Sequence, residues 1–241
     1  MMTLEARTER SHVPAGHILD NPVWSTLTTS HTGFALRQGE AARFPPDIAP
    51  FVAVGAATPA ALADARRLVP VGEVVFFLGV APAFDDSWRV HAKSEVHQLV
   101  SPQQVDFTPF EHEAPGVLGA ADREDMLKLA AEVYPYFFRT RTADLGTYMG
   151  VRRNGQLVAV GGERMRVPGF QEVSTVCVRP EHARSGFGGL ITLALARRAA
   201  TRGDRTFAHC VAGNAPVFGL GNKLGGTARA VLSMWRAERL R

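Results

Sequence analysis

The sequence predicts an α/β protein built on a mixed sheet. Apolar runs of strand length alternate with amphipathic runs of helix length along most of the chain. Asn154-Gly155 separates two strand-like runs, as in a two-residue hairpin. A glycine-rich turn from Gly186 to Gly189 then connects a strand to an apolar helix. With 241 residues, the chain is long enough for one large domain or two modest ones.

The composition, 46% hydrophobic and 21% charged, is typical of a soluble globular protein. The formal net charge is only +4 and the arginines are scattered, so we expect no nucleic-acid partner. The most apolar stretch, Val69 to Phe84, is interrupted by Glu73 and by prolines, and the first residues lack an apolar core. We therefore expect neither a membrane span nor a signal peptide. Cys177 and Cys210 lie inside apolar runs, which indicates buried free thiols in a cytoplasmic protein. No His/Cys cluster has the spacing of metal ligands, so we expect no metal.

Residues 1–104 are predicted to form an N-terminal α/β domain. Thr58 is expected to cap a helix that starts at Pro59. The run from Glu73 to Val80 is too continuously apolar for an edge strand, so we expect it to be covered on both faces. The expected elements are a short helix at Ile18–Leu27, a strand at Thr32–Ala42, an extended segment at Pro50–Val54, a helix at Pro59–Leu68, and strands at Glu73–Val80 and Arg89–Leu99.

Residues 105–241 are predicted to form the second domain, after a proline-containing connection within Ser101–Leu118. The first helix of this domain is amphipathic, because Met126, Leu129, Ala130 and Val133 recur at helical spacing. The expected helices are Ala121–Val133, Gly188–Arg202 and Ala215–Leu224, and the expected strands are Tyr148–Arg153, Gln156–Met165, Glu172–Val178, Thr206–Val211 and Ala228–Arg236.

The segment from Val173 to Gly189 carries the chemistry. An apolar strand ends at Arg179-Pro180, and a short loop leads through Gly186 and Gly188 into a helix. Glycines at these positions let successive backbone N–H groups point into one concavity, to which the helix N-terminus adds positive potential. Such a turn binds phosphate or pyrophosphate, although a glycine pair at a strand-to-helix turn can also be purely structural.

This region resembles the GNAT superfamily of N-acetyltransferases over about residues 105–236. The family's pyrophosphate loop, Gln/Arg-x-x-Gly-x-Gly/Ala, falls on Ala183 to Gly188, and its second signature falls on Asn214 and Leu224-Gly225. Two residues depart from the family pattern: Ala183 replaces a Gln or Arg, and Gly221 replaces a tyrosine. The resemblance implies a GNAT fold in the C-terminal half, with an N-terminal unit that is a candidate degenerate copy of it.

The resemblance also implies a binding site for acetyl-CoA, the expected co-substrate. The main chain of Val176, Cys177 and Val178 is expected to bind the pantetheine arm in the manner of an added strand. The pyrophosphate and the rest of the cofactor are expected to contact Ala183, Arg184, Ser185, Gly186, Phe187, Gly188, Gly189 and Asn214.

The expected reaction is transfer of an acetyl group to the amine of a small or amino-acid-like acceptor by direct attack on the thioester. The amine must first lose a proton to a base. By the resemblance, Glu172 is the first candidate for that base, since it lies 14 residues before Gly186, where some family members carry a general-base glutamate. Glu163 on the preceding strand is the second, and either can instead be a solvated strand-end carboxylate. A backbone N–H, at Val178, is expected to stabilise the developing oxyanion. The alternative function is a CoA-binding regulatory or vestigial protein, which Ala183 and the missing tyrosine favour. A homodimer stays open.

Overall fold

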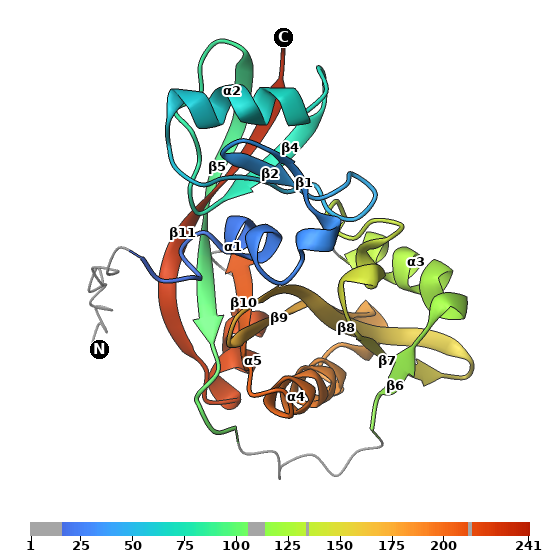
Figure 1. The fold of residues 1–241 in the computed structure, drawn as a ribbon. Helices are drawn as coiled ribbons and strands as arrows, with labels where there is room; N and C mark the ends of the chain where they lie inside the picture. Colours follow the sequence, from blue (N-terminus) through green and yellow to red (C-terminus); the bar gives the residue numbers. More distant parts are fainter. Residues whose placement is uncertain (1–15, 106–113, 134, 212–213) are drawn as a thin grey trace, which may run out of the picture.

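The computed structural model describes residues 16–105, 114–133, 135–211 and 214–241. These residues form two sheets (Figure 1), a three-stranded sheet in the order β1-β2-β3 and an eight-stranded sheet in the order β4-β11-β5-β10-β9-β8-β7-β6. The strands are β1 (Leu36–Gln38), β2 (Ala41–Arg43), β3 (Val52–Val54), β4 (Val74–Leu78), β5 (Trp88–Val100), β6 (Gly116–Leu118), β7 (Tyr148–Arg153), β8 (Gln156–Val167), β9 (Phe170–Val178), β10 (Arg205–Val211) and β11 (Thr227–Arg239). The helices are α1 (Pro22–Thr28), α2 (Pro59–Leu68), α3 (Arg123–Val133), α4 (Phe187–Ala200) and α5 (Ala215–Lys223). The predicted mixed α/β class is confirmed.

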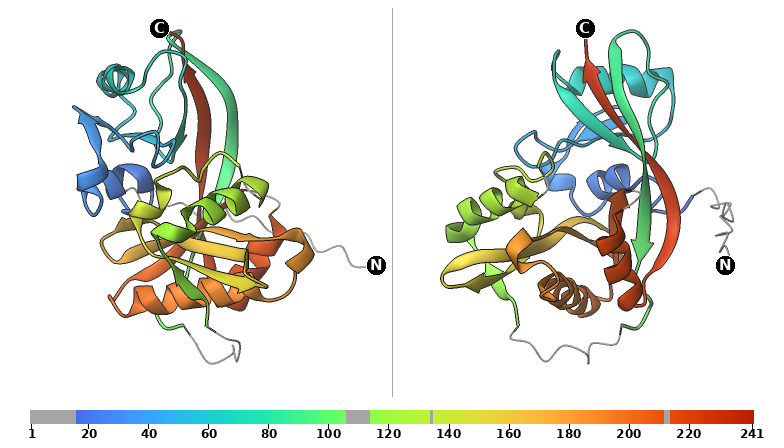
Figure 2. Two further views of the ribbon diagram at one scale, coloured as in Figure 1. Left: turned by 90° about the vertical axis from the view of Figure 1, so that its right-hand side faces the viewer. Right: turned by 180° about the vertical axis from the view of Figure 1, so that it is seen from behind.

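Helices cover both faces of the large sheet. α4 lies against β8 and β9 on one face, and α1 and α3 lie on the other (Figures 1 and 2). Between α4 and the sheet, Leu190, Ile191 and Leu195 pack against strand residues such as Val158 and Val173. The apolar face of each helix is thus buried against the sheet, which is what holds the turn before α4 in a fixed position.

The short-range predictions are confirmed. Thr58 caps α2, since its hydroxyl accepts a hydrogen bond from the Ala61 N–H at 3.1 Å. Asn154 and Gly155 join β7 to β8 with φ values of 51° and 79°, the left-handed pair that a two-residue hairpin turn needs. Both signals act within a few residues, so they are readable from sequence.

The predicted strand at Thr32–Ala42 is wrong in its first half. Thr32–Phe34 form a 3-10 turn, and the remainder forms the β1–β2 hairpin rather than one strand. The hairpin turns at Gly39, whose φ is 48°. A residue in the left-handed region ends an extended strand, and glycine adopts this region readily. Gly39 is therefore the residue of the sequence that indicates a turn between β1 and β2.

The expectation that Glu73–Val80 is not an edge strand is also wrong. β4 is the first strand in the order of the large sheet and pairs only with β11 within it. Its outer side is covered by the chain before β3, because the Phe76 N–H donates to Pro50 O at 2.9 Å and Phe51 bridges Phe76. β4 is therefore buried although no described strand of the large sheet pairs with its outer edge. Val75 and Phe77 are 0% exposed.

The two halves of the chain share the large sheet. β5, from the first hundred residues, lies between β11 and β10 and pairs with both. Figure 1 shows β5 and β11 running together from the lower part of the molecule to α2 at the top. A division at residues 104 and 105 stays a prediction, and a degenerate N-terminal copy of the fold is not confirmed. No helix in the described ranges is long and apolar enough to cross a membrane.

Candidate active site

A gap opens between β9 and β10 in the middle of the large sheet. The two strands are parallel neighbours, but their ladder ends at the pair formed by Phe207 and Glu172. β9 continues to Val178 and β10 to Val211, each paired along its other edge, β9 with β8 and β10 with β5. The facing edges beyond the last pair therefore present main-chain N–H and C=O groups to the gap. An extended ligand can bind there in the manner of an added strand.

A β-bulge bends β9 beside this gap. The β8–β9 register shifts at Thr175, whose φ of 55° is left-handed and uncommon for a β-branched residue. Past the bulge, the Arg179 N–H donates to Val158 O on β8 at 2.9 Å. Because successive N–H groups of a strand point to opposite edges, the Val178 N–H points away from β8 and into the gap.

The chain leaves β9 through a tight turn that ends at α4. The 3-10 turn Pro180–His182 is followed by Arg184 and Gly186, with φ values of 64° and 84°. α4 begins at the next residue without a side-chain cap, so its first N–H groups are available to an anion. A Cβ built on Gly188 would lie 3.5 Å from Val176 Cγ1, which places the first turn of α4 directly against β9. The turn and the gap are thus adjacent.

The other predicted loop residues surround the same turn. Ala183 and Ser185 are exposed, and Gly189 is buried in the first turn of α4. Phe187 lies under the Arg153 guanidinium, 4.9 Å from the ring centroid. Within the loop, the N–H groups of Ala183 and Ser185 already donate to Pro180 O and His182 O, so a ligand would bind chiefly to the N–H groups at the start of α4.

Both cysteines are buried free thiols, as predicted. Cys177 packs with Met126 and Leu129 under α3, and burial raises the pKa of its thiol to about 12. Burial also raises the pKa of Cys210. Cys177 can therefore contribute its main chain to the gap, while its thiol stays protonated.

Glu172 is the last residue of β9 that pairs with β10, so it lies at the vertex of the gap. It is 0% exposed. Arg164 binds its two oxygens through Nε and Nη2 at 2.9 and 2.8 Å, and His209 Nδ1 lies 2.9 Å from Oε1. Burial by itself raises the pKa of this carboxyl, but the Arg164 charge and the hydrogen bonds from Arg164 and His209 outweigh it and lower the pKa to about 2. Glu172 is therefore a fixed anion with little basicity at neutral pH. Sequence reasoning missed both partners, because nothing local connects strands that are neighbours only in the fold.

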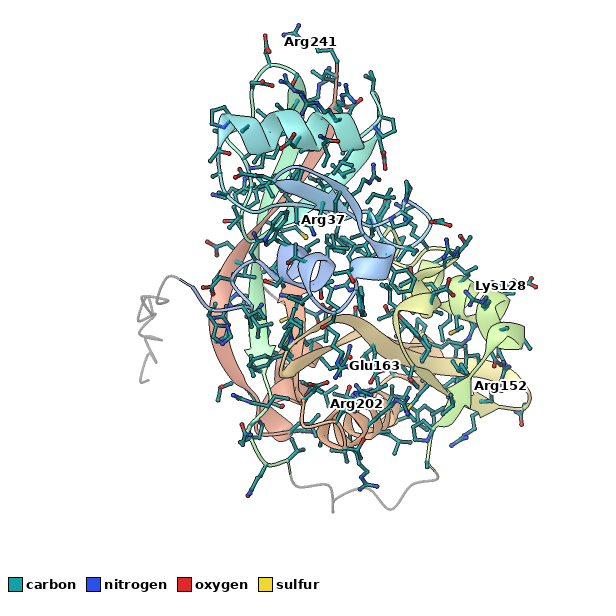
Figure 3. All side chains as sticks on the ribbon, in the orientation of Figure 1. Arg37, Lys128, Arg152, Glu163, Arg202 and Arg241 are labelled. Carbon is teal, nitrogen blue, oxygen red and sulfur yellow. The ribbon has the colours of Figure 1, made fainter. Side chains whose placement is uncertain are left out.

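Glu163 lies on the opposite face of the sheet, against the C-terminal end of α4. Its Oε1 accepts a hydrogen bond from Arg202 Nη2 at 2.6 Å, and its Oε2 accepts one from the Thr147 N–H at 3.0 Å (Figure 3). Arg198 Nε is 3.8 Å from the same Oε1. These contacts hold the C-terminal end of α4 against the sheet, at the opposite end of the helix from the glycine turn. Which carboxylate acts as a base stays a prediction.

The second family signature lies at α5. Asn214 caps this helix, its Oδ1 accepting from the Val217 N–H at 3.4 Å. A Cβ built on Gly221 would lie 2.9 Å from Leu99 Cδ1, so a side chain at this position requires Leu99 to move. Leu99 belongs to β5, and it fills the first part of the space that the family's tyrosine would need.

The aromatic run between α3 and β7 contributes to the core. Phe137 stacks on Phe51 with ring centroids 5.6 Å apart and lies 4.8 Å from Phe76. Tyr136 is 71% exposed, and Tyr134 lies outside the described residues. This segment thus joins the two halves of the chain.

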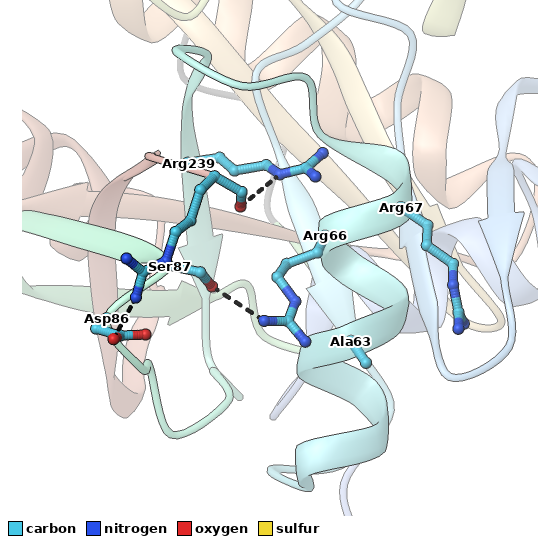
Figure 4. A pocket seen from close by; sticks show the side chains of 7 residues that line it. Ala63, Arg66, Arg67, Asp86, Ser87 and Arg239 are labelled. Atoms are coloured by element: carbon cyan, nitrogen blue, oxygen red, sulfur yellow. Dashed lines mark hydrogen bonds and ion pairs between the residues drawn. The ribbon is translucent and has the colours of Figure 1, made fainter.

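A hollow of about 460 Å³ lies beside α2 (Figure 4). Figure 1 shows α2 at the other end of the molecule from α4. Its arginines are already engaged: Arg66 with Asp85, Arg67 with Asp64, Arg241 with Asp86, and Arg239 with Val69 O. This hollow is therefore no candidate for the active site. In the part of the chain that the structure describes, no group of three or more His, Cys, Asp or Glu side chains is arranged to hold a metal.

Comparison with known proteins agrees with this geometry. The family model for FR47-like proteins matches residues 148–236. A putative acetyltransferase of the GNAT family from Novosphingobium aromaticivorans is 28% identical, with a TM-score of 0.84, over 93% of this chain and 99% of that chain. A GCN5-related N-acetyltransferase from Kribbella flavida has a TM-score of 0.61 at 17% identity, over 89% of this chain and 95% of its own. A GCN5-related N-acetyltransferase-like protein from Streptococcus suis has a TM-score of 0.54 at 13% identity, over 82% and 84% of the two chains. No curated protein matches.

The splayed parallel strands, the bulge and the glycine turn before α4 define an α/β fold of the acetyltransferase type. The likeness to the Kribbella and Streptococcus structures concerns the fold alone. Together with the family model and the Novosphingobium structure, these features support the resemblance of the chain to the GNAT superfamily. This fold supports acetyl-CoA-dependent acetyltransferase activity.

Proposed function

We propose that this protein is an N-acetyltransferase that moves the acetyl group of acetyl-CoA to the amine of a small or amino-acid-like acceptor. The observation that carries the proposal is the gap between β9 and β10, which leads directly to the uncapped N-terminus of α4. An extended amide chain that ends in a pyrophosphate matches this arrangement, because main-chain groups line the gap and an anion site closes it.

In this proposal the pantetheine arm bonds to the main chain of Val176, Cys177 and Val178. The pyrophosphate lies in the loop from Ala183 to Gly189, which turns through the left-handed residues Arg184 and Gly186 into the uncapped N-terminus of α4. Asn214 remains a proposed cofactor contact through the start of α5.

The reaction joins the acceptor nitrogen to the thioester carbonyl carbon and breaks the bond from that carbon to sulfur. The Val178 N–H, which points into the gap, is the proposed donor to the oxygen that gains negative charge. Glu172 is the carboxylate at the vertex, while Glu163 is engaged at the far end of α4. Because Arg164 and His209 bind the oxygens of the buried Glu172, we propose that the acceptor amine loses its proton to water near the vertex, and not directly to this carboxylate.

The leaving thiolate has no tyrosine at the family position. A thiol pKa of about 8.5 lets the sulfur depart as an anion, so the absence slows the reaction without preventing it. Leu99 against Gly221 also favours the second candidate function, a CoA-binding regulatory or vestigial protein.

CoA binding measured by calorimetry tests the cofactor site. Gly188→Glu should abolish binding, since its side chain would extend from the first turn of α4 beside Val176 and repel the phosphates. Ala200→Glu is the matched control, because it adds the same charge at the exposed last residue of the same helix. Equal CoA affinity in Gly188→Glu and in the parent protein would refute the site.

Release of free thiol from acetyl-CoA with a panel of small amines tests the reaction. Transfer to at least one amine supports the enzyme, whereas CoA binding without any transfer supports the regulatory alternative.

A further inference from the structure

A line of buried side chains crosses four neighbouring strands at the vertex of the gap. It runs from Gln98 on β5 through His209 on β10 and Glu172 on β9 to Arg164 on β8. Gln98 and Glu172 are 0% exposed, and the side chain of His209 is 5% exposed. We propose that His209 is a positioning residue that clamps β10 to β9 and so sets the width of the gap near the thioester. The inference rests on the proposed function, since it assigns the gap to acetyl-CoA.

His209 is placed where main-chain pairing stops. The last β9–β10 pair joins Glu172 to Phe207, and His209 is two residues farther along the diverging strand. Its ring reaches back across the opening, with Nδ1 2.9 Å from Glu172 Oε1. The hydrogen bond from the imidazole to Glu172 thereby takes the place of the next main-chain hydrogen bond between β9 and β10.

The surrounding groups fix the hydrogen-bonding roles of the ring. Arg229 Nε donates to Gln98 Oε1, so the Gln98 amide nitrogen is the group that faces His209 Nε2, at 3.0 Å. An amide nitrogen only donates, hence Nε2 of the imidazole accepts. The remaining ring hydrogen is on Nδ1 and is donated to Glu172. The neutral ring thus holds two strands with both nitrogens in use.

Each end of this line is anchored to the N-terminal half. Gln98 also donates to Leu19 O at 3.0 Å, and its partner Arg229 binds Asp20. At the other end, the Arg164 guanidinium lies over the Phe51 ring, 5.1 Å from its centroid. Both walls of the vertex are therefore held from outside the gap, and the His209–Glu172 contact is the point where they meet.

The clamp acts at one end of the proposed cofactor site. The pyrophosphate loop lies past the other end of β9, after Val178. Loss of the clamp should misplace the reacting carbonyl while leaving the phosphate contacts intact. A merely structural residue would instead lower the fraction of folded protein and leave the turnover of each folded molecule unchanged.

The test compares His209→Leu, His209→Gln and Glu73→Gln in the full-length protein. Glu73→Gln is the control, because it breaks another ion pair of a buried arginine, Arg43, on the far side of the molecule. We expect His209→Leu to lower kcat by about 10- to 100-fold, with the Kd for CoA changed by less than about twofold. His209→Gln, which keeps a donor, should recover part of the loss, and Glu73→Gln should retain the parent kcat.

Amide hydrogen exchange supplies a measure that does not depend on turnover. In His209→Leu the amides at Arg205 to Phe207 and Phe170 to Glu172 should exchange at least about tenfold faster, with little change in the β8–β9 ladder. Unchanged exchange at these amides overturns the clamp, whether or not the protein proves to be an enzyme. Normal kcat in a folded His209→Leu also overturns it, while absence of turnover in the parent protein refutes the proposed function instead.

Discussion

We predict that the buried His31 makes the stability of this protein sensitive to mild acid. The residue is 8% exposed and packs edge-on against Phe34 and Phe44, with ring centroids 5.9 and 6.4 Å away. Its Nδ1 is buried without a hydrogen-bond partner among the described residues. Burial first, and then the nearby Arg166 charge, lower the pKa of His31 to about 4, and the opposing effect of Glu172 is smaller.

The lowered pKa fixes both the sign and the size of the effect. Between pH 6.5 and about 4 the unfolded chain binds a proton at this position that the folded protein does not. The contribution of His31 to the unfolding free energy is therefore fully present above about pH 6.5, and it is lost as the pH falls toward 4. The difference between the two pKa values corresponds to about 3 kcal/mol of unfolding free energy at the acid end, and about 2 kcal/mol of it is lost between pH 7 and pH 4.5.

Urea unfolding at pH 7 and pH 4.5 measures this loss. His31→Leu removes the titrating group and retains an apolar side chain, so its stability should fall by about 2 kcal/mol less than that of the parent protein over this range. His91→Gln, which removes an exposed histidine paired with Glu238, should follow the parent. Equal pH dependence in His31→Leu and the parent would refute the reasoning, because the buried imidazole would then contribute nothing to it.

Two further predictions concern the ion pairs and the division of the chain. Glu172→Gln removes the charge that pairs with the buried Arg164 and should lower the unfolding free energy by about 3–5 kcal/mol in urea unfolding; Glu163→Gln should cost less, because Arg202 is 27% exposed and can turn to water. Equal losses in the two variants would contradict this account of the vertex. The fragment 105–241, expressed alone, should fail to unfold cooperatively by circular dichroism because it lacks β5; a soluble, cooperative and active fragment would show that the first half is dispensable.

The sequence was informative where the deciding contacts are local. The turn at Asn154-Gly155, the cap at Thr58 and the glycine turn before α4 each depend on residues within one turn of one another, so residue type predicts them. Strand order depends on contacts between distant segments. Nothing near Glu73–Val80 indicates that β11, more than a hundred residues later, is its partner. Continuous apolarity correctly predicted burial of this strand, and it did not predict which element covers it.

The same limit applies to the candidate site. Spacing from the glycine turn placed Glu172 on the strand beside the gap, and the structure places it at the vertex. The partners of its carboxylate come from β8 and β10, and they lower its pKa to about 2, while its role as the base stays a prediction. A residue's distance along the chain from a motif can therefore predict where it lies, whereas its protonation depends on partners that only the tertiary structure brings together.

The arrangement of the vertex indicates that the N-terminal half helps to hold the walls of the proposed cofactor gap. β10 forms one wall of the gap, and its other edge pairs with β5 over five residues. β9 forms the opposite wall, and Arg164, which binds Glu172 of that strand, packs over the Phe51 ring. Each wall thus depends on a contact from the first hundred residues, so the separation of β9 and β10 is set by both halves together. A change in the N-terminal half that moves β5 or Phe51 should alter the gap without touching any residue of the acetyl-CoA motifs.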